Sequence, residues 1–212
     1  PIGALIDGTR AKRALIVGGA WALALLGVAI VAVPTLAVVF AADVTMAVLG
    51  AVFAPTVAAI TLGLFGSRGV AAQLGRNAVF DRFGNLFIAA LAGLVGTYFG
   101  QRSVFYMLPL FAALTTIAVL SIPQSAINHE LARGLDQTNL ARSRPYAWRH
   151  LFADRPFAVL ALGTALFHFA NAPMLALASQ KLALEAKGFE SAVTSAAMIG
   201  AQLATIPMAF LV

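Results

Sequence analysis

The chain has 212 residues, of which 61% are hydrophobic and 10% charged, and its formal net charge is +6. A soluble domain is about half apolar and about a quarter charged, so this composition excludes an ordinary soluble protein. Disorder is excluded too, because disordered chains have low hydrophobicity. The absence of cysteine excludes disulfides and cysteine-ligated metal sites.

Six stretches without a charged residue have about the length of a transmembrane helix. They are residues 14–42, 44–67, 83–101, 103–129, 156–180 and 191–212. A helix rises about 1.5 Å per residue, so about 20 residues cross a hydrocarbon core of about 30 Å. The sequence therefore predicts an all-α membrane protein with six transmembrane helices, the first two of which meet around Asp43.

The basic residues of the connections divide unevenly between the two sides of the membrane. Eleven fall on one side, which holds the first 13 residues, the connection at 68–82 and the long loop 123–155, and three fall on the other. Because lysine and arginine are enriched in cytoplasmic loops, loop 123–155 is predicted to be cytoplasmic. The same asymmetry accounts for the positive net charge without a nucleic-acid partner.

Loop 123–155 is the largest polar segment and separates four predicted spans from two. We expect a short surface helix near residues 125–135. The loop is open to two interpretations, a plain linker and a regulatory element.

The third span is rich in small residues at helical spacing. They are Gly84, Ala89, Ala92, Gly93, Gly96 and Gly100, with a GxxxG motif formed by the last two. Small residues at this spacing let helix backbones approach closely in lipid. Close packing against a neighbouring helix is expected, and the same surface would let two halves of a protein rock against each other.

Polar side chains within the spans are the candidate functional residues, because an unsatisfied polar group is costly in hydrocarbon. His168 and Asn171 share one face of the fifth span, and Pro173 follows them. Gln202 lies in the sixth span, and Asn85 begins the third. We predict that these four polar side chains line a pathway for substrate or protons. For His168 the alternative is a structural hydrogen bond.

Sequence motifs typical of soluble enzymes and metal sites are missing. The sequence has no phosphate-binding loop, no HExxH and no GxSxG, and its three histidines are scattered. We therefore expect no enzyme, no metal and no cofactor.

The first thirteen residues carry a resemblance to a known family. Gly3 and Asp7, followed by the basic run of Arg10, Lys12 and Arg13, resemble the signature loop between helices two and three of the major facilitator superfamily. Gly8 stands where the family usually has arginine, and Arg10 replaces the usual second glycine. The resemblance implies that these five matching residues form a cytoplasmic gating loop.

The resemblance also sets the organisation of the chain. Its six spans would be helices 3 to 8 of a twelve-helix major facilitator fold, in a bacterial-type inner (plasma) membrane. Residues 1–122 would then hold the end of helix 2 and helices 3–6, residues 123–155 the loop between the halves, and residues 156–212 helices 7–8. The missing helices of the same transporter would be partners of this segment.

The activity implied by the resemblance is secondary active transport by alternating access. The partners would be the lipid bilayer, a small solute such as a drug or metabolite, and protons; efflux is among the activities expected. One alternative is an uncoupled facilitator or uptake carrier. Another, from a different class, is a six-helix membrane subunit or scaffold that needs a partner ATPase.

Overall fold

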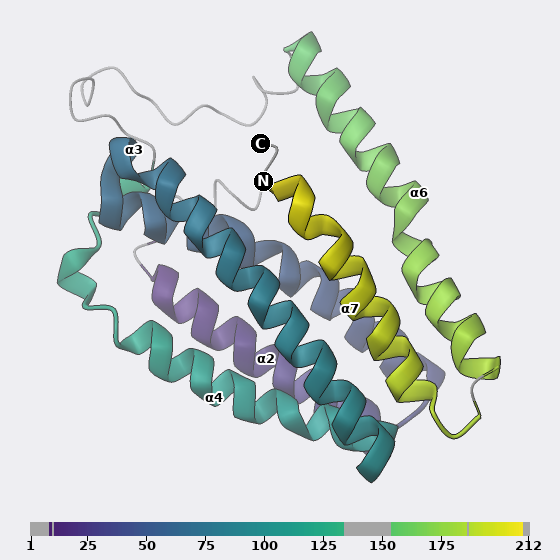
Figure 1. Ribbon diagram of the computed structural model, residues 1–212. Coiled ribbons are helices and arrows are strands. Elements are labelled where there is room, and N and C mark those ends of the chain that lie inside the picture. Colours follow the sequence, from purple (N-terminus) through teal and green to yellow (C-terminus); the bar gives the residue numbers. More distant parts are fainter. Residues whose placement is uncertain (1–8, 10, 134–153, 186, 210–212) are drawn as a thin grey trace. The chain divides into compact units, whose positions relative to one another are not determined.

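The computed structural model describes residues 9, 11–133, 154–185 and 187–209, and helices dominate this part of the chain (Figure 1). The helices are α2 (Lys12–Ala32), α3 (Leu36–Phe99), α4 (Met107–Leu120), α6 (Arg155–Glu185) and α7 (Glu190–Ala209). Three short 3-10 helices join them: η1 (Gln101–Tyr106), η2 (Gln124–Ala126) and η3 (Leu131–Arg133). The described residues contain no strand, and the predicted all-α fold is confirmed.

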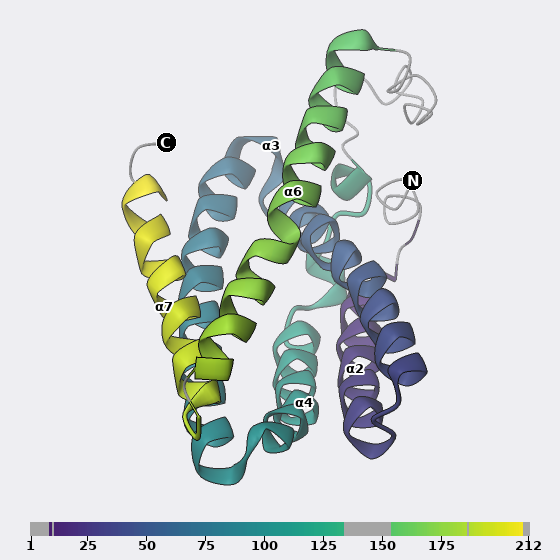
Figure 2. The same cartoon turned by 90° about the vertical axis from the view of Figure 1, so that its right-hand side faces the viewer.

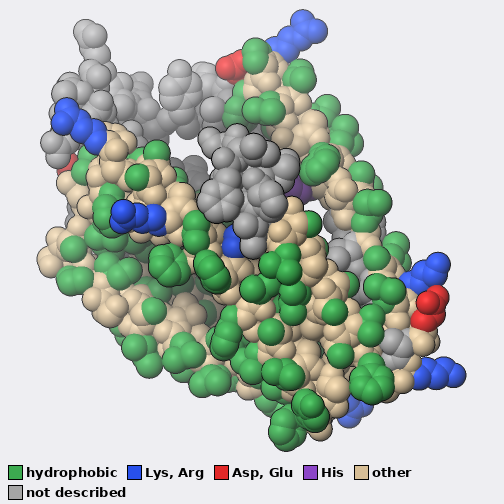
Figure 3. Space-filling model, viewed as in Figure 1, with side chains coloured by type: hydrophobic (Ala, Val, Ile, Leu, Met, Phe, Trp, Pro, Cys, Tyr) green, Lys and Arg blue, Asp and Glu red, His purple; other side chains and the backbone are tan. Residues whose placement is uncertain are grey.

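Three helical stretches in the described part are long and apolar enough to cross a membrane. They are Lys12–Ala32, Leu36–Phe99 and Gln101–Leu120. Many large apolar side chains on these helices are exposed, and they cover much of the face seen in Figure 3. A protein surface of this kind is stable against lipid or further helices but not against water.

The boundary between the first two spans lies eight to ten residues earlier than the sequence analysis predicted. Helix α2 ends at Ala32 and α3 begins at Leu36, so Asp43 lies inside a helix and not in a connection. Pro34 cannot continue α2, because its nitrogen carries no hydrogen. Thr35 then caps α3, with its Oγ1 accepting a 3.4 Å hydrogen bond from the Val38 amide. Charge alone misplaced this boundary.

Helix α3 consists of two helical parts that meet at Gly66. This glycine has φ 66° and ψ 179°, a backbone conformation open almost only to glycine. Beyond it the chain turns back on itself (Figure 2), and Asn77 Nδ2 donates a 3.1 Å hydrogen bond to Thr61 Oγ1. Gln73 Nε2 donates in turn to Asn77 Oδ1 at 3.0 Å. The turn at Gly66 thus brings polar side chains of the two parts together.

We expect Gly66→Ala to lower the free energy of unfolding by about 1–3 kcal/mol, the usual strain of a side chain in this conformation. A Cβ at Gly66 would meet nothing within 4 Å, so the effect would come from the backbone alone. Gly50 is the matched control, because it lies in the helical first part of α3 and a Cβ there also meets nothing. Gly50→Ala should leave stability equal or higher, by up to about 1 kcal/mol. Thermal unfolding in detergent measures both, and equal behaviour of the two variants would contradict the assignment of strain.

The contacts divide the chain into two compact units. Unit 1 comprises Pro1–Asn77 and Phe105–Pro145. Within it, α2 and α4 lie side by side and antiparallel (Figure 1): Trp21 Nε1 donates to Thr116 Oγ1 at 3.0 Å. Closer to the end of α2 and the start of α4, the backbone of Gly27 lies against the Leu108 side chain. A small core joins α2, α3, α4 and the residues after α4, formed by Ile16, Ile60, Val119 and Ile127.

Unit 2 comprises Ala78–Val104 and Tyr146–Val212. In this unit the last part of α3 packs against α7, and α6 packs against α7 as well. The last part of α3 ends at Phe99, where Gly100 takes φ 86° and stops the helix.

The described part of loop 123–155, residues 123–133, does not form a continuous surface helix, and the last two residues of the helix expected near 125–135 lie outside the described residues. Residues 124–126 and 131–133 are separate 3-10 turns instead. Ile127 and Ala132 are buried rather than exposed, so this part of the loop belongs to the packed part of unit 1.

Candidate functional site

His168 and Asn171 lie near the middle of α6, and both are exposed in the structure. The Asn171 amide donates a 2.8 Å hydrogen bond to the carbonyl oxygen of Phe167, one helical turn earlier. The His168 ring stands edge-on to the Phe167 ring, with 5.8 Å between the ring centroids. Three residues apart on one helix, His168 and Asn171 share a face, as predicted. Helix α6 continues through position 173 without a break.

Gln202, on α7, is a partner of an arginine. Arg82 Nη1 donates a 3.1 Å hydrogen bond to Gln202 Oε1, and this bond joins α3 to α7 within unit 2. Asn85 lies one turn from Asp81 and donates to its carboxylate at 3.3 Å. Two of the four predicted pathway residues are thus hydrogen-bonded to charged side chains near the start of the span 83–101.

Arg82 is the functional candidate that the sequence analysis did not single out. Arg82 directly precedes the uncharged stretch 83–101, and its side chain reaches across to Gln202 on α7. The signal in the sequence was the spacing: Arg82, Ala89, Gly93 and Gly96 fall on one face of a helix. Long basic side chains near a span's end commonly extend toward polar groups.

Small residues bring α3 and α7 close together along the same face. A Cβ at Gly93 would lie 2.7 Å from Ser195 Cβ, and one at Gly96 would lie 2.6 Å from Ser191 Cβ. The pairs 96 with 191 and 93 with 195 run in opposite directions, so the two helices are antiparallel. The predicted close packing of the third span is confirmed, and its neighbour is α7.

Of the predicted gating loop, Lys12 and Arg13 lie within the described residues, whereas Gly3, Asp7 and Arg10 lie outside them. Lys12 is fully buried, and its Nζ donates a 2.8 Å hydrogen bond to the Thr9 carbonyl. Arg13 Nη2 donates to the Leu120 carbonyl at 3.0 Å. Leu120 is the last residue of α4, where carbonyl groups carry partial negative charge, so Arg13 joins α2 to the end of α4.

Metal-binding residues do not gather in the described part of the chain. No group of three or more histidine, aspartate or glutamate side chains there could hold an ion.

Comparison with known proteins decides the family. The family model described as Major Facilitator Superfamily matches residues 1–212. The chain belongs to the major facilitator superfamily. Two curated relatives are described as uncharacterized MFS-type transporters of Mycobacterium tuberculosis, one from strain CDC 1551 / Oshkosh and one from strain ATCC 25618 / H37Rv. Each is 39% identical over 216 residues, which cover 100% of the chain and 51% of the relative.

Membership of the major facilitator superfamily confirms the resemblance found in the first thirteen residues, despite the imperfect motif there. With its long apolar helices, the chain is a multi-pass membrane protein. It spans about half the length of the curated relatives it matches. No solved structure matches the chain.

Proposed function

We propose that the protein containing this chain is a secondary active transporter, moving a small drug or metabolite by alternating access with coupling to protons. Its superfamily membership and the transporter names of two bacterial relatives support this assignment. Both favour a transporter over an enzyme and over a membrane subunit driven by an ATPase. We place the protein in the bacterial inner membrane with loop 123–155 in the cytoplasm.

The observation that carries the proposal is the contact between α3 and α7. These helices lie on opposite sides of loop 123–155 in the sequence, so in our proposal they belong to different halves of the transporter. They meet through glycines and serines at close range and through the hydrogen bond between Arg82 and Gln202. A contact between small residues suits two helices that must separate and come together again, because few interlocking side chains oppose the motion.

The proposed division into halves follows the sequence boundaries 1–122, 123–155 and 156–212. The compact units are grouped differently, since unit 2 combines residues 78–104 with residues 146–212. In the proposed mechanism this grouping reflects the contact between the halves in one state of the transporter. In the opposite state, α3 and α7 separate near Arg82.

His168 and Asn171 are our candidates for the pathway. They form a polar face in the middle of an apolar helix and are exposed on α6, where a solute or a further helix would meet them. Imidazole is the side chain best suited to exchange a proton near neutral pH. Transport sites of such proteins lie near the membrane midplane between the halves. We therefore assign proton exchange to His168 and solute contact to Asn171.

Transport by the intact protein in proteoliposomes tests this function. A pH-sensitive dye inside the vesicles reports proton movement while a panel of labelled drugs and metabolites reports solute movement. We expect solute-dependent proton flux, lost in His168→Gln, while exchange of labelled for unlabelled solute persists. Asn171→Ala should weaken solute exchange at least several-fold. Leu166→Ala, another exposed position of α6, is the control.

The outcomes separate the candidate functions. Solute movement without proton movement in the unaltered protein would point to the uncoupled facilitator. Proton-coupled transport that is unchanged in His168→Gln and Asn171→Ala would contradict the assignment of these two residues.

A further inference from the structure

The end of the first part of α3 has carbonyl groups that its own helix does not use. A helix that stops at Phe65 leaves its last four carbonyls, at residues 62–65, without intrahelical amide partners. The amide of Asn128 donates a 3.0 Å hydrogen bond to one of them, the carbonyl of Gly63. A residue from the start of loop 123–155 therefore caps the end of a helix more than sixty positions earlier.

The segment 123–132, here named the docked segment, lies directly against the backbone at Gly63. A Cβ on Gly63 would come within 3.0 Å of the Asn128 carbonyl oxygen and 3.1 Å of both Ile127 Cγ2 and Ala132 Cβ. Ile127 is only 4% exposed and Ala132 only 2%. The absence of a side chain at Gly63 creates the space that the docked segment fills.

The docked segment is also held in shape by its own hydrogen bonds. The Asn128 side chain accepts hydrogen bonds from the amides of Glu130 at 3.0 Å and Leu131 at 3.1 Å. The Ala132 amide donates to the Asn128 carbonyl at 3.0 Å. These bonds satisfy polar groups that must accompany Ile127 and Ala132 into the packed region, so burial leaves them paired.

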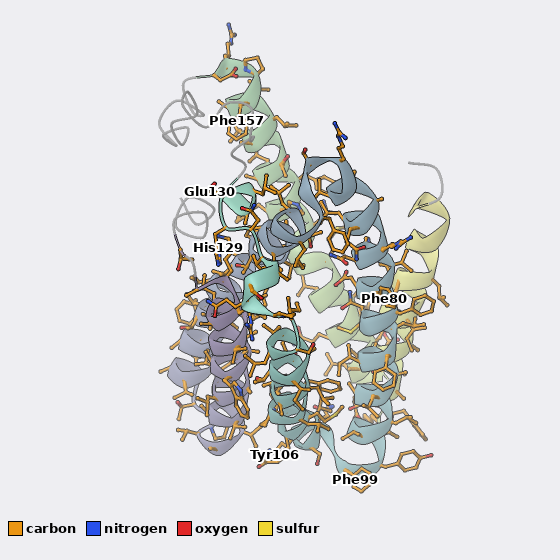
Figure 4. The ribbon with its side chains drawn as sticks, turned by 90° about the vertical axis from the view of Figure 1, so that its left-hand side faces the viewer. Phe80, Phe99, Tyr106, His129, Glu130 and Phe157 are labelled. Atoms are coloured by element: carbon orange, nitrogen blue, oxygen red, sulfur yellow. The ribbon has the colours of Figure 1, made fainter. Side chains whose placement is uncertain are left out.

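Ile127 connects the docked segment to three helices at once. Its side chain belongs to the core cluster with Ile16 of α2, Ile60 of α3 and Val119 of α4. Figure 4 shows the neighbouring His129 and Glu130 at the end of unit 1 opposite to Tyr106, which precedes α4. The docked segment thus closes one end of the helices of unit 1.

We propose that the docked segment is a structural cap that makes the start of α2, the end of the first part of α3 and the end of α4 move as one body. Residues 123–132 then move with the helices of unit 1, and the connection between the proposed halves begins after residue 132. This role in movement rests on the proposed transport function, whereas docking itself does not. Gly63 is its seat, the position whose missing side chain leaves room for the segment, and Ile127 is its anchor, the side chain that enters the core cluster.

Cysteine labelling tests the docking directly, and the chain has no native cysteine. In the intact protein, with any other cysteine replaced, we compare the rates at which N-ethylmaleimide modifies Ile127→Cys and Glu130→Cys. Glu130 is exposed, so the Glu130→Cys variant sets the unprotected rate. We expect the Ile127→Cys variant to react at least about tenfold more slowly, because its thiol is reached only when the segment opens. Equal rates would overturn the proposal.

Gly63→Leu supplies the second arm of the experiment. Its side chain cannot share the space with the docked segment, so when it is combined with Ile127→Cys the thiol should react nearly as fast as that of Glu130→Cys. Gly50→Leu is the matched control on the same helical part and should leave the thiol at position 127 protected, because nothing lies within 4 Å of a Cβ at Gly50. Protection that survives Gly63→Leu would overturn the assignment of Gly63 as the seat.

A milder variant keeps the test decisive where Gly63→Leu does not fold. Asn128→Ala removes the acceptor for two amides of the docked segment and leaves the helices unaltered, and it should raise the labelling rate at position 127 several-fold. For the role in movement, solute exchange should fall several-fold in both undocking variants and stay unchanged in Gly50→Leu. Undocking with unchanged exchange would overturn that role. Labelling needs no transport, so failure of the proposed function leaves the docking result intact.

Discussion

Gly93→Leu is expected to separate α3 from α7 and to lower the stability of unit 2 by about 3 kcal/mol. The space at Gly93 is already filled by Ser195, whose Cβ would lie 2.7 Å and Oγ 2.8 Å from an added Cβ. Both atoms are fixed close to the α7 backbone, so the helix itself must move. Overpacking of a tight interface typically costs about 1–3 kcal/mol, and a four-carbon side chain between two backbones belongs at the upper end. Thermal unfolding of the intact protein in detergent measures the loss.

A control and a compensating pair distinguish this contact from a general effect of leucine. Gly84 lies in the same helical part, and a Cβ there meets nothing within 4 Å, so Gly84→Leu should be nearly neutral. Gly93→Ala should be destabilising alone but largely restored by Ser195→Gly, which returns the space to the opposite helix. Absence of any such coupling in the double-mutant cycle would show that the two helices are not in contact there.

The sequence predicted this close packing for a set of small residues that includes Gly93 and Gly96. Its spacing did not separate the glycines that pack from the one that ends the helix, because Gly96 and Gly100 form a GxxxG motif. In the structure Gly96 and Gly93 pack against serines, whereas Gly100 takes φ 86° and ends the helix. A glycine that packs and a glycine that terminates look alike in a sequence, because both are selected for lacking a Cβ.

Helix boundaries show the same limit. Uncharged stretches predicted the helical membrane class, yet Asp43 proved to be inside α3, and the actual break is at Pro34. Proline and a capping threonine were the better signals, because they act on the backbone, whereas one charge can remain in a helix near its end. The turn at Gly66 lies next to the predicted end of the second uncharged stretch at residue 67, but a glycine in a sequence does not reveal its φ.

The candidate site could be predicted only in its residue types. Composition and depth pointed to Gln202 and Asn85 as polar groups needing partners, and both have them, in Arg82 and Asp81. The pairing of Gln202 with Arg82 joins positions 120 apart in the chain. Such a contact depends on which helices pack together, and the hydropathy pattern of a sequence does not show which helices are neighbours. All four pathway assignments remain predictions for the same reason.

Loss of the hydrogen bond between Arg82 and Gln202 is expected to favour separation of α3 and α7 by about tenfold. A hydrogen bond to a charged group contributes about 1.5–3 kcal/mol when sheltered and less when exposed, as this one is. About 1.4 kcal/mol corresponds to a factor of ten in the equilibrium between closed and open forms. Arg82→Met keeps the apolar stem of the side chain and removes its donors, and Gln202→Leu removes the acceptor.

Ala89 offers a reporter for this equilibrium. It is 6% exposed and lies on the same helical face as Arg82 and Gly93, so a cysteine there meets a soluble thiol reagent mainly when the helices part. In Ala89→Cys protein, Arg82→Met and Gln202→Leu should each raise the labelling rate about tenfold. The double variant should add little, because both changes remove one interaction. Arg76→Met, at an exposed arginine earlier in α3, is the control.

The direction of the transport effect follows from the same equilibrium. If opening at Arg82 is the slow step of the cycle, the two variants transport faster; if closing is slow, they transport more slowly. In both cases the labelling rate rises, because it depends only on the fraction of time that α3 and α7 are apart. Labelling that stays unchanged in both variants would contradict a gating role for this pair and would leave it as a static contact between neighbouring helices.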